Sequence, residues 1–217
     1  MLKVYKHNET NFNHNGLAIL NKATNVRISR EINGDYRLSF ELPEDDGKWS
    51  YLKQRNIVIC EGQKFRIYKK GRQKQGTINR EVECLHVISE ANSHIPFFDV
   101  QIGKTAREIM VAAFAGTPFT VMSEMEVAAL GMEWVTDLTD IVEPISKTTP
   151  LEIIKIVIEQ LQKGELYIDN YKVALVKRIG RDTGHHCTLA NNLKSLGDVE
   201  DSTNLITRLY AYGKDRS

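Results

Sequence analysis

Residues 26–42, VRISREINGDYRLSFEL, predict two β-strands joined by a tight turn. Apolar and polar side chains alternate on both sides of the turn, as they do in strands with one buried and one solvated face. Asn33 and Gly34 both tolerate a positive φ, which a two-residue hairpin turn requires. The alternation over residues 36–42 stops at Pro43, which cannot continue a central strand. We therefore expect a half-buried hairpin near the start of the chain.

The strand pattern continues to about residue 90. A second hairpin is predicted from Asn56 to Lys69, with its turn at Glu61–Gly62. One long strand is predicted over Thr77–Ser89, where the apolar phase changes at Cys84–Leu85. Such a change indicates a bulge or a strand that is buried on both faces. Several strands with short polar turns and no helix are typical of a barrel or a sandwich.

Helical patterns replace the strands in the middle of the chain. Residues 105–116 and 149–164 predict two amphipathic helices. Each begins with a capping box, in which a Thr is followed three residues later by a Glu, and each reaches a glycine that can end it. The second helix has a wide apolar face, and a hairpin predicted over residues 165–178 offers a sheet for it to pack against. The middle therefore predicts a small α+β unit.

The last segment, NLITRLYAYGKD (residues 204–215), predicts a return to β structure. A strand is expected from Leu205 to Tyr212, ending at Gly213. Because this strand follows the helical region, we expect it to pair with the N-terminal strands. The predicted fold is α+β, mainly β: a discontinuous β-barrel-like domain, residues 1–97 plus 185–217, with a small α/β domain inserted at residues 98–184.

Composition excludes several classes of function. A formal net charge of +1 over 217 residues provides no global field for nucleic acid or an acidic membrane. No apolar run approaches the roughly 18 residues of a membrane span, and the N-terminus is too polar for a signal peptide. The three cysteines, Cys60, Cys84 and Cys187, are odd in number and far apart. They predict buried free thiols and not a disulfide or metal framework.

Two groups of residues carry side chains that could support chemistry. His185, His186 and Cys187 follow Asp182, but adjacent histidines on a strand point to opposite faces and cannot easily share a metal. We expect a solvated loop that runs into a strand. Cys84 and His86 could share a strand face, but no orienting group or oxyanion site is indicated nearby. A core thiol beside a partly exposed imidazole is expected.

The remaining charged and aromatic groups have simpler interpretations. The acidic run Glu44–Asp46 lacks the alternating ligands and fixed glycine of a calcium loop, so a solvated turn is expected. The basic run of Lys69, Lys70, Arg72 and Lys74 predicts an exposed loop at a strand end, with a nucleic-acid or protein contact as the alternative. Trp49, Tyr51 and Trp134 are expected to be packing or interface anchors. The sequence therefore predicts no catalytic, cofactor-binding or metal-binding residue and no cofactor.

The order of these segments resembles a known family. YRLSFELP (36–43), YLKQRNIVICEGQKFRIYKK (51–70), REVECLHVISE (80–90), TTPLEIIKIVIEQLQKGELYIDNYKVAL (148–175) and NLITRLYAYGKD (204–215) follow one another as in the N-terminal region of the prophage tail endopeptidase family, also called tail-associated lysins. This region is similar to phage baseplate hub proteins. The resemblance implies barrel-like domains interrupted by a smaller α/β unit. It also implies a homotrimer that caps the tail tube beneath the distal tail protein ring.

The resemblance leads to further expectations about function. Peptidoglycan cleavage would lie in later domains, so the chain is expected to be an N-terminal fragment and not itself an enzyme. Its expected partners are the distal tail protein and other tail or baseplate proteins, with DNA only in transit through the lumen and no membrane binding. The expected location is the virion tail tip, after synthesis in the bacterial host cytoplasm. The alternatives are a cell-wall endopeptidase within these residues and a host-surface binding module.

Overall fold

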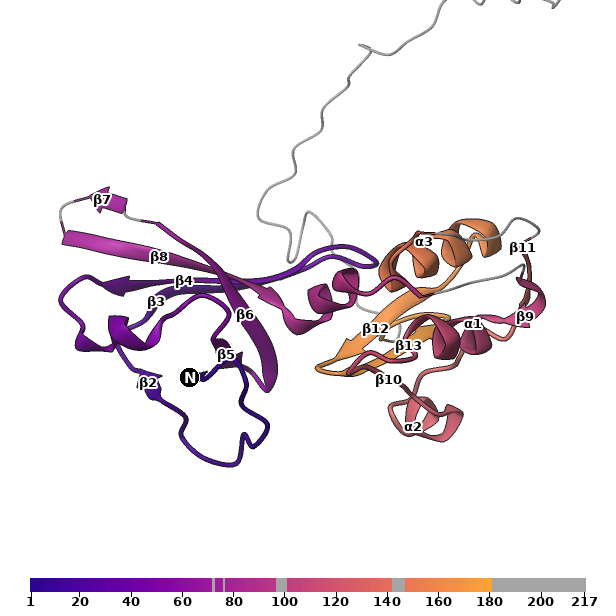
Figure 1. Cartoon of the computed structure of the whole chain (residues 1–217), viewed down its shortest axis with the longest axis horizontal. Helices are drawn as coiled ribbons and strands as arrows, with labels where there is room; N and C mark the ends of the chain where they lie inside the picture. The colour runs from indigo at the N-terminus through magenta and orange to yellow at the C-terminus, as the bar shows by residue number, and fades with distance from the viewer. Residues whose placement is uncertain (72, 76, 97–100, 142–146, 181–217) are drawn as a thin grey trace, which may run out of the picture. The chain divides into compact units, whose positions relative to one another are not determined.

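The computed structural model describes residues 1–71, 73–75, 77–96, 101–141 and 147–180 (Figure 1). An antiparallel sheet occupies the N-terminal part and has the strand order β2-β1-β5-β6-β8-β4-β3, with β7 paired to β8. Its strands are β1 (Leu2–Tyr5), β2 (Ala18–Leu20), β3 (Thr24–Arg30), β4 (Tyr36–Pro43), β5 (Ile57–Cys60), β6 (Gln63–Lys70), β7 (Gln73–Gln75) and β8 (Thr77–His86). The 3-10 helix η1 (Gly47–Tyr51) connects β4 to β5.

The connection between β2 and β3 makes this sheet curl. These two strands lie at opposite ends of the strand order, yet only residues 21–23 separate them in sequence. An extended chain advances at most about 3.6 Å per residue, so the ends that these residues join lie within about 14 Å. A flat sheet of seven strands would hold its edges much further apart, because neighbouring strands are about 4.8 Å apart. The sheet is therefore a half-barrel around its core.

The β4 strand confirms the predicted alternation. Tyr36, Leu38, Phe40 and Leu42 are all buried, and the residues between them are half-buried or exposed. They pack with the inward side chains of the other strands into one apolar core. Both predicted hairpins are present, since β3 pairs with β4 and β5 pairs with β6. The Glu61–Gly62 turn has the positive φ values that its sequence predicts, 49° and 78°.

Two details of the first hairpin differ from prediction. The turn is a three-residue loop, in which Glu31 N–H donates to Asp35 O at 2.8 Å and only Asn33 has a positive φ, 57°. The β3 strand is mostly exposed and not half-buried, and Val26 is 44% exposed. The physical reason is position: β3 is the edge of the sheet, and its register with β4 shifts between Thr24 and Arg27.

The β8 strand is shorter and more regular than predicted. It ends at His86, and residues Val87–Ser93 form the 3-10 helix η2. Val82, Cys84 and His86 are all buried, so the alternation continues to the end of the strand without a phase change. The predicted bulge at Cys84–Leu85 is wrong, because the irregularity in this ladder lies on β6, between Ile67 and Lys69. The apolar residues after His86 belong to η2.

The second part of the chain combines helices with small sheets. Its elements are β9 (Gln101–Thr105), α1 (Ala106–Ala113), β10 (Thr120–Val121), α2 (Glu124–Ala129), β11 (Leu138–Ile141), α3 (Pro150–Leu161), β12 (Glu165–Asp169) and β13 (Lys172–Val176). Strands β10, β13 and β12 form one sheet, in which β10 is parallel to β13, and β9 pairs with β11. The hairpin predicted over residues 165–178 is β12–β13.

The helix starts follow the local signals in the sequence. Thr105 with Glu108 and Thr149 with Glu152 form complete capping boxes at α1 and α3, as predicted. A third box, Ser123 with Glu126, starts α2, which was not predicted. Helix α3 ends at Leu161, earlier than the predicted end at Gly164. Gln162 takes the left-handed conformation that ends the helix.

Buried apolar residues form two clusters, one on each side of residue 87. We call residues 1–86 the sheet lobe and residues 87–180 the mixed lobe. Residues 1–180 form one compact unit. None of the described helices is long and apolar enough to cross a membrane. The predicted strand Leu205–Tyr212 and the whole second segment of the discontinuous domain lie outside the described residues, so the domain limits stay a prediction.

Candidate interaction groove

Cys84 and His86 share one face of β8, as predicted, but both are completely buried. The expectation of a partly exposed imidazole is therefore wrong. The ring packs against Tyr36 with centroids 4.4 Å apart, because β8 lies in the middle of the curled sheet. His86 Nδ1 accepts the Ile88 N–H at 3.2 Å, so Nε2 carries the proton and donates to Gln63 Oε1 at 3.2 Å.

The electrostatics of this pair oppose nucleophilic catalysis. Burial raises the pKa of the Cys84 thiol well above its usual range and lowers the pKa of His86 to about 3. A catalytic cysteine needs an accessible thiolate with a lowered pKa, usually beside a protonated imidazole. The pair thus packs the core of the sheet lobe. Cys60 is also a buried free thiol, which agrees with the prediction for both cysteines.

The acidic run does not converge on a common centre. Asp46 accepts the Lys48 N–H at 2.9 Å and starts η1, whereas Glu44 pairs with Arg80. Within the described ranges, no group of three His, Cys, Asp or Glu side chains is placed to hold a metal ion. The predicted turn is present, but it is not simply solvated, because Asp46 is buried and Glu44 is paired. His185, His186, Cys187 and Asp182 lie outside the described residues.

The basic run is occupied by contacts within the sheet lobe. Lys69 Nζ lies 2.5 Å from Glu83 Oε1, and Lys70 Nζ donates to Leu52 O at 2.8 Å. The side chains of Arg72 and Lys74 are not among those described. The two described lysines therefore support strand pairing in the sheet lobe and do not form a cationic patch.

Trp49 and Trp134 act as packing anchors, as predicted, whereas the side chain of Tyr51 is exposed. Trp49 Nε1 donates to Pro43 O at 2.7 Å, and the Arg80 guanidinium lies 5.1 Å from its ring centroid. Tyr51 is 40% exposed, but Trp49 is half-buried and held inward. Trp134 is buried in the core of the mixed lobe. Trp49 and Tyr51 therefore do not form a mutually exposed pair.

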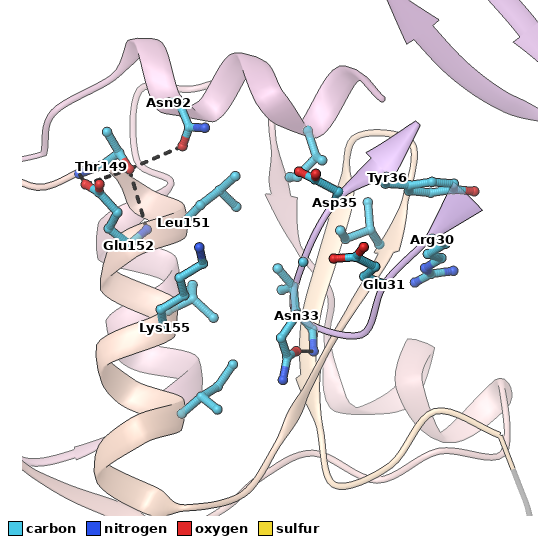
Figure 2. A pocket seen from close by; sticks show the side chains of 16 residues that line it. Arg30, Glu31, Asn33, Asp35, Tyr36, Asn92, Thr149, Leu151, Glu152 and Lys155 are labelled. Carbon is cyan, nitrogen blue, oxygen red and sulfur yellow. Dashed lines mark hydrogen bonds between the residues drawn. The ribbon is translucent and has the colours of Figure 1, made fainter. Parts of the chain in front are cut away.

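A groove lies between the β3–β4 hairpin and α3 (Figure 2). It has a volume of about 550 Å³, which lies within the range of ligand and peptide sites. Figure 2 shows Glu31, Asn33 and Asp35 on the hairpin side and Glu152 and Lys155 on the helix side. Strand β12 contributes Leu166 and Ile168 to the lining.

The groove has an aliphatic lining and a polar rim with charges of both signs. The aliphatic residues are Ile88, Leu151, Ile154, Ile158, Leu166 and Ile168. Arg30 lies 5.1 Å from the Tyr36 ring centroid and 5.9 Å from that of Tyr167, and Asp35 pairs with Arg37 at 2.5 Å. Such a mixed rim suits an amphipathic protein segment better than a polyanion such as nucleic acid.

No motif in the sequence predicts this groove. Most of its lining comes from residues 30–36 and 149–168, which are more than a hundred positions apart, so no local spacing links them. One indirect signal exists. Leu151 and Ile158 belong to the wide apolar face predicted for α3, yet these two residues are only half-buried. The fully buried residues of the helix include Ile153, Ile154 and Val157. Leu151 and Ile158 line the groove.

The curled sheet of residues 2–86 is the part of the chain that a known family shares. Residues 2–86 match the prophage endopeptidase tail N-terminal domain family. The resemblance stated from the sequence is confirmed over this range. No curated protein sequence matches the chain.

Two solved structures of prophage tail proteins share the fold. Prophage tail protein gp18 from Listeria monocytogenes EGD-e has a TM-score of 0.58 at 14% identity, over 80% of this chain and 49% of that one. The 43 kDa tail protein of prophage MuSo2 from Shewanella oneidensis has a TM-score of 0.53 at 12% identity, over 78% of this chain and 55% of that one. The chain spans about half the length of these proteins. At such identities the likeness shows the fold, which is mainly β with a curled sheet.

Proposed function

We propose that the chain is a structural module of a phage or prophage tail tip, where it forms part of the baseplate hub and caps the tail tube. The observation that carries this proposal is the match of residues 2–86 to a tail N-terminal domain family. The fold shared with two prophage tail proteins supports it. The net charge of +1 suits a tube end that lets DNA pass without binding it.

Docking to the distal tail protein ring would use the edge of the half-barrel. Strand β3 is at the end of the strand order, and Val26 on it is 44% exposed. An edge strand offers backbone groups and side chains to a neighbouring chain. The full-length protein would assemble as a homotrimer, and its location would be the virion tail tip after synthesis in the host cytoplasm.

A sedimentation experiment with the full-length protein and the distal tail protein of the same prophage tests this docking. We expect a complex that Val26→Asp weakens, because a carboxylate would be desolvated at the β3 edge. Val111→Asp is the matched control, since Val111 is 49% exposed on α1 of the mixed lobe. A complex that withstands Val26→Asp and dissociates with Val111→Asp would place the contact elsewhere, and no complex at all would contradict the docking.

A cell-wall endopeptidase within these residues is the enzymatic alternative. We expect purified residues 1–217 to release no muropeptides from peptidoglycan, because the Cys84–His86 pair is buried and has pKa values unsuited to catalysis. Lysozyme on the same substrate is the positive control. Release that disappears in Cys84→Ser, His86→Gln, His185→Ala or His186→Ala would overturn the structural assignment.

A host-surface binding module would need an exposed aromatic platform, and the inward position of Trp49 gives this alternative no support. The return of Leu205–Tyr212 to the N-terminal sheet remains part of the proposal. It is supported by the open strand order of the described sheet, which has a second end at β2, away from the edge proposed for docking.

A further inference from the structure

Asn33 ties the β3–β4 hairpin to the start of β12. Its Oδ1 accepts the Leu166 N–H at 2.6 Å, and its Nδ2 donates to Gly164 O at 3.0 Å. One carboxamide thus bonds to a strand backbone through both a donor and an acceptor, as a peptide group does in a β-ladder. Figure 2 places Asn33 on the hairpin, across the groove from Lys155.

Asn170 makes the reciprocal contact from the mixed lobe. It lies in the β12–β13 turn, where its Oδ1 accepts the Lys64 N–H at 2.9 Å and its Nδ2 donates to Gly62 O at 3.0 Å. Its own N–H donates to Gln63 Oε1 at 3.1 Å. The Lys64 ammonium lies 5.5 Å from the Tyr171 ring centroid. Each lobe therefore extends an asparagine from a hairpin turn onto the backbone of the other.

Both asparagines have left-handed backbone conformations, with φ values of 57° at Asn33 and 53° at Asn170. Asparagine tolerates this conformation better than most residues. Its side chain also carries a donor as well as an acceptor, whereas an ionised aspartate has acceptors only. The two positions therefore need both the backbone tolerance and the amide chemistry of asparagine.

The lobes bury separate apolar cores, and within residues 1–180 the chain passes between them once, after His86. Lobes of one chain that lack a large shared apolar interface are expected to move relative to each other. Two contacts on one joint act as a bivalent interaction. While one contact is formed, it keeps the donor and acceptor groups of the other contact close together, at a high effective concentration. Two further contacts cross the joint: Gln63 Nε2 donates to Asp169 Oδ1 at 2.9 Å, and Arg66 pairs with Glu90 at 2.7 Å. Losing one asparagine contact is therefore tolerated, and losing both weakens the joint.

We propose that Asn33 and Asn170 form a two-point latch that fixes the lobes and sets the width of the groove between the β3–β4 hairpin and α3. Release of both points lets the lobes separate about the connection at His86–Val87 while each keeps its own core. The latch follows from contacts within residues 1–180 and does not depend on the proposed place in a tail.

Distance measurements between spin labels test the latch in the full chain. Labels attached through Lys53→Cys in the sheet lobe and Glu159→Cys on α3 report the separation, because both positions are exposed. Cys60 and Cys84 are buried, and Cys187→Ser removes the third thiol. The test variants are Asn33→Gly, Asn170→Gly and the double variant, since glycine tolerates the left-handed backbone and lacks the side-chain amide.

We expect the single variants to keep the native distance distribution and the double variant to gain a longer, broader population. Asn25→Gly is the matched control. Asn25 also has a positive φ, 50°, and a bonded side chain, but its partner Glu41 lies within the sheet lobe. A native distribution in the double variant would overturn the latch, as would a single variant that opens the joint as far as the double one.

Amide hydrogen exchange provides a second measurement. In Asn33→Gly, exchange at Leu166 is expected to rise about fivefold, the effect of one lost hydrogen bond, with Lys64 unchanged. In the double variant both amides are expected to exchange faster than in either single variant. If each amide exchanged at the same rate in the double variant as in the single variant that removes its own partner, the two hydrogen bonds would be independent. That result would contradict a shared joint.

Discussion

Replacing Phe65 by Ala is expected to lower the free energy of unfolding by about 3–5 kcal/mol, the usual cost of removing a buried aromatic ring. Phe65 is completely buried on β6, in the middle of the strand order. Its ring packs edge-on to Tyr36 and to His86, with centroids 5.3 Å away in each case. The variant leaves a cavity. Strand β6 is paired on both sides, so the backbone cannot move inward to fill this cavity. Urea unfolding followed by circular dichroism measures the change.

Two controls make this prediction specific to packing. Phe65→Leu keeps most of the buried volume and should cost less than half as much as Phe65→Ala. Phe12→Ala removes the same ring from a half-buried position in the loop after β1, and we expect a much smaller loss. A loss of under about 1 kcal/mol for Phe65→Ala would show that this position is not a tightly packed core site.

Acidification from pH 7 to pH 5 is expected to destabilise the chain by about 2 kcal/mol through His86 alone. Burial, with a smaller effect from Arg30, lowers the folded-state pKa of this imidazole from its ordinary value of 6.5 to about 3. Above pH 6.5 the ring is neutral in both states and contributes no pH dependence. Below it the unfolded chain binds a proton that the folded chain does not. Stability therefore falls until the pH approaches 3.

The charged groups that act on this ring are Arg30 and Lys64, which oppose its protonation, and Asp169, which favours it. Carboxylates elsewhere also titrate in this range, so the measured quantity is the difference in pH dependence between the native chain and His86→Gln. We expect the variant to lack about 2 kcal/mol of the loss between pH 7 and pH 5. If the variant does not fold, the His86 ring resonances in NMR report its pKa directly. Equal pH slopes in both chains, or titration near pH 6.5, would contradict a neutral buried imidazole.

Features fixed by neighbouring residues could be predicted from the sequence. The capping boxes at Thr105 and Thr149 and the Glu61–Gly62 turn depend on groups within four positions of one another. Features set by strand order could not. The exposure of β3 follows from its place at the edge of the sheet, and the depth of His86 follows from the central place of β8. Neither the exposure of β3 nor the burial of His86 can be predicted from the residues that neighbour them in sequence.

The groove and the latch show the same limit. Asn33 and Gly164 are 131 positions apart, and only the folded chain brings their polar groups together. The sequence marked Asn33 as a turn residue, because it tolerates a positive φ, and placed Asn170 inside the hairpin predicted over residues 165–178. It could not assign their carboxamides, which bond to a backbone in the other lobe. The family resemblance was the stronger guide to function, since it used the order of many segments and no single site.

Cryo-electron microscopy of particles from the induced prophage tests the proposed role most directly. We predict that density at the tip, where the tail tube ends, fits the half-barrel of residues 2–86 in copies arranged around the tube axis. Gold-labelled antibodies against residues 1–217 should mark the same end of the tail. Purified particles that contain the full-length protein only along the tube or in the head, or that lack it, would contradict the assignment.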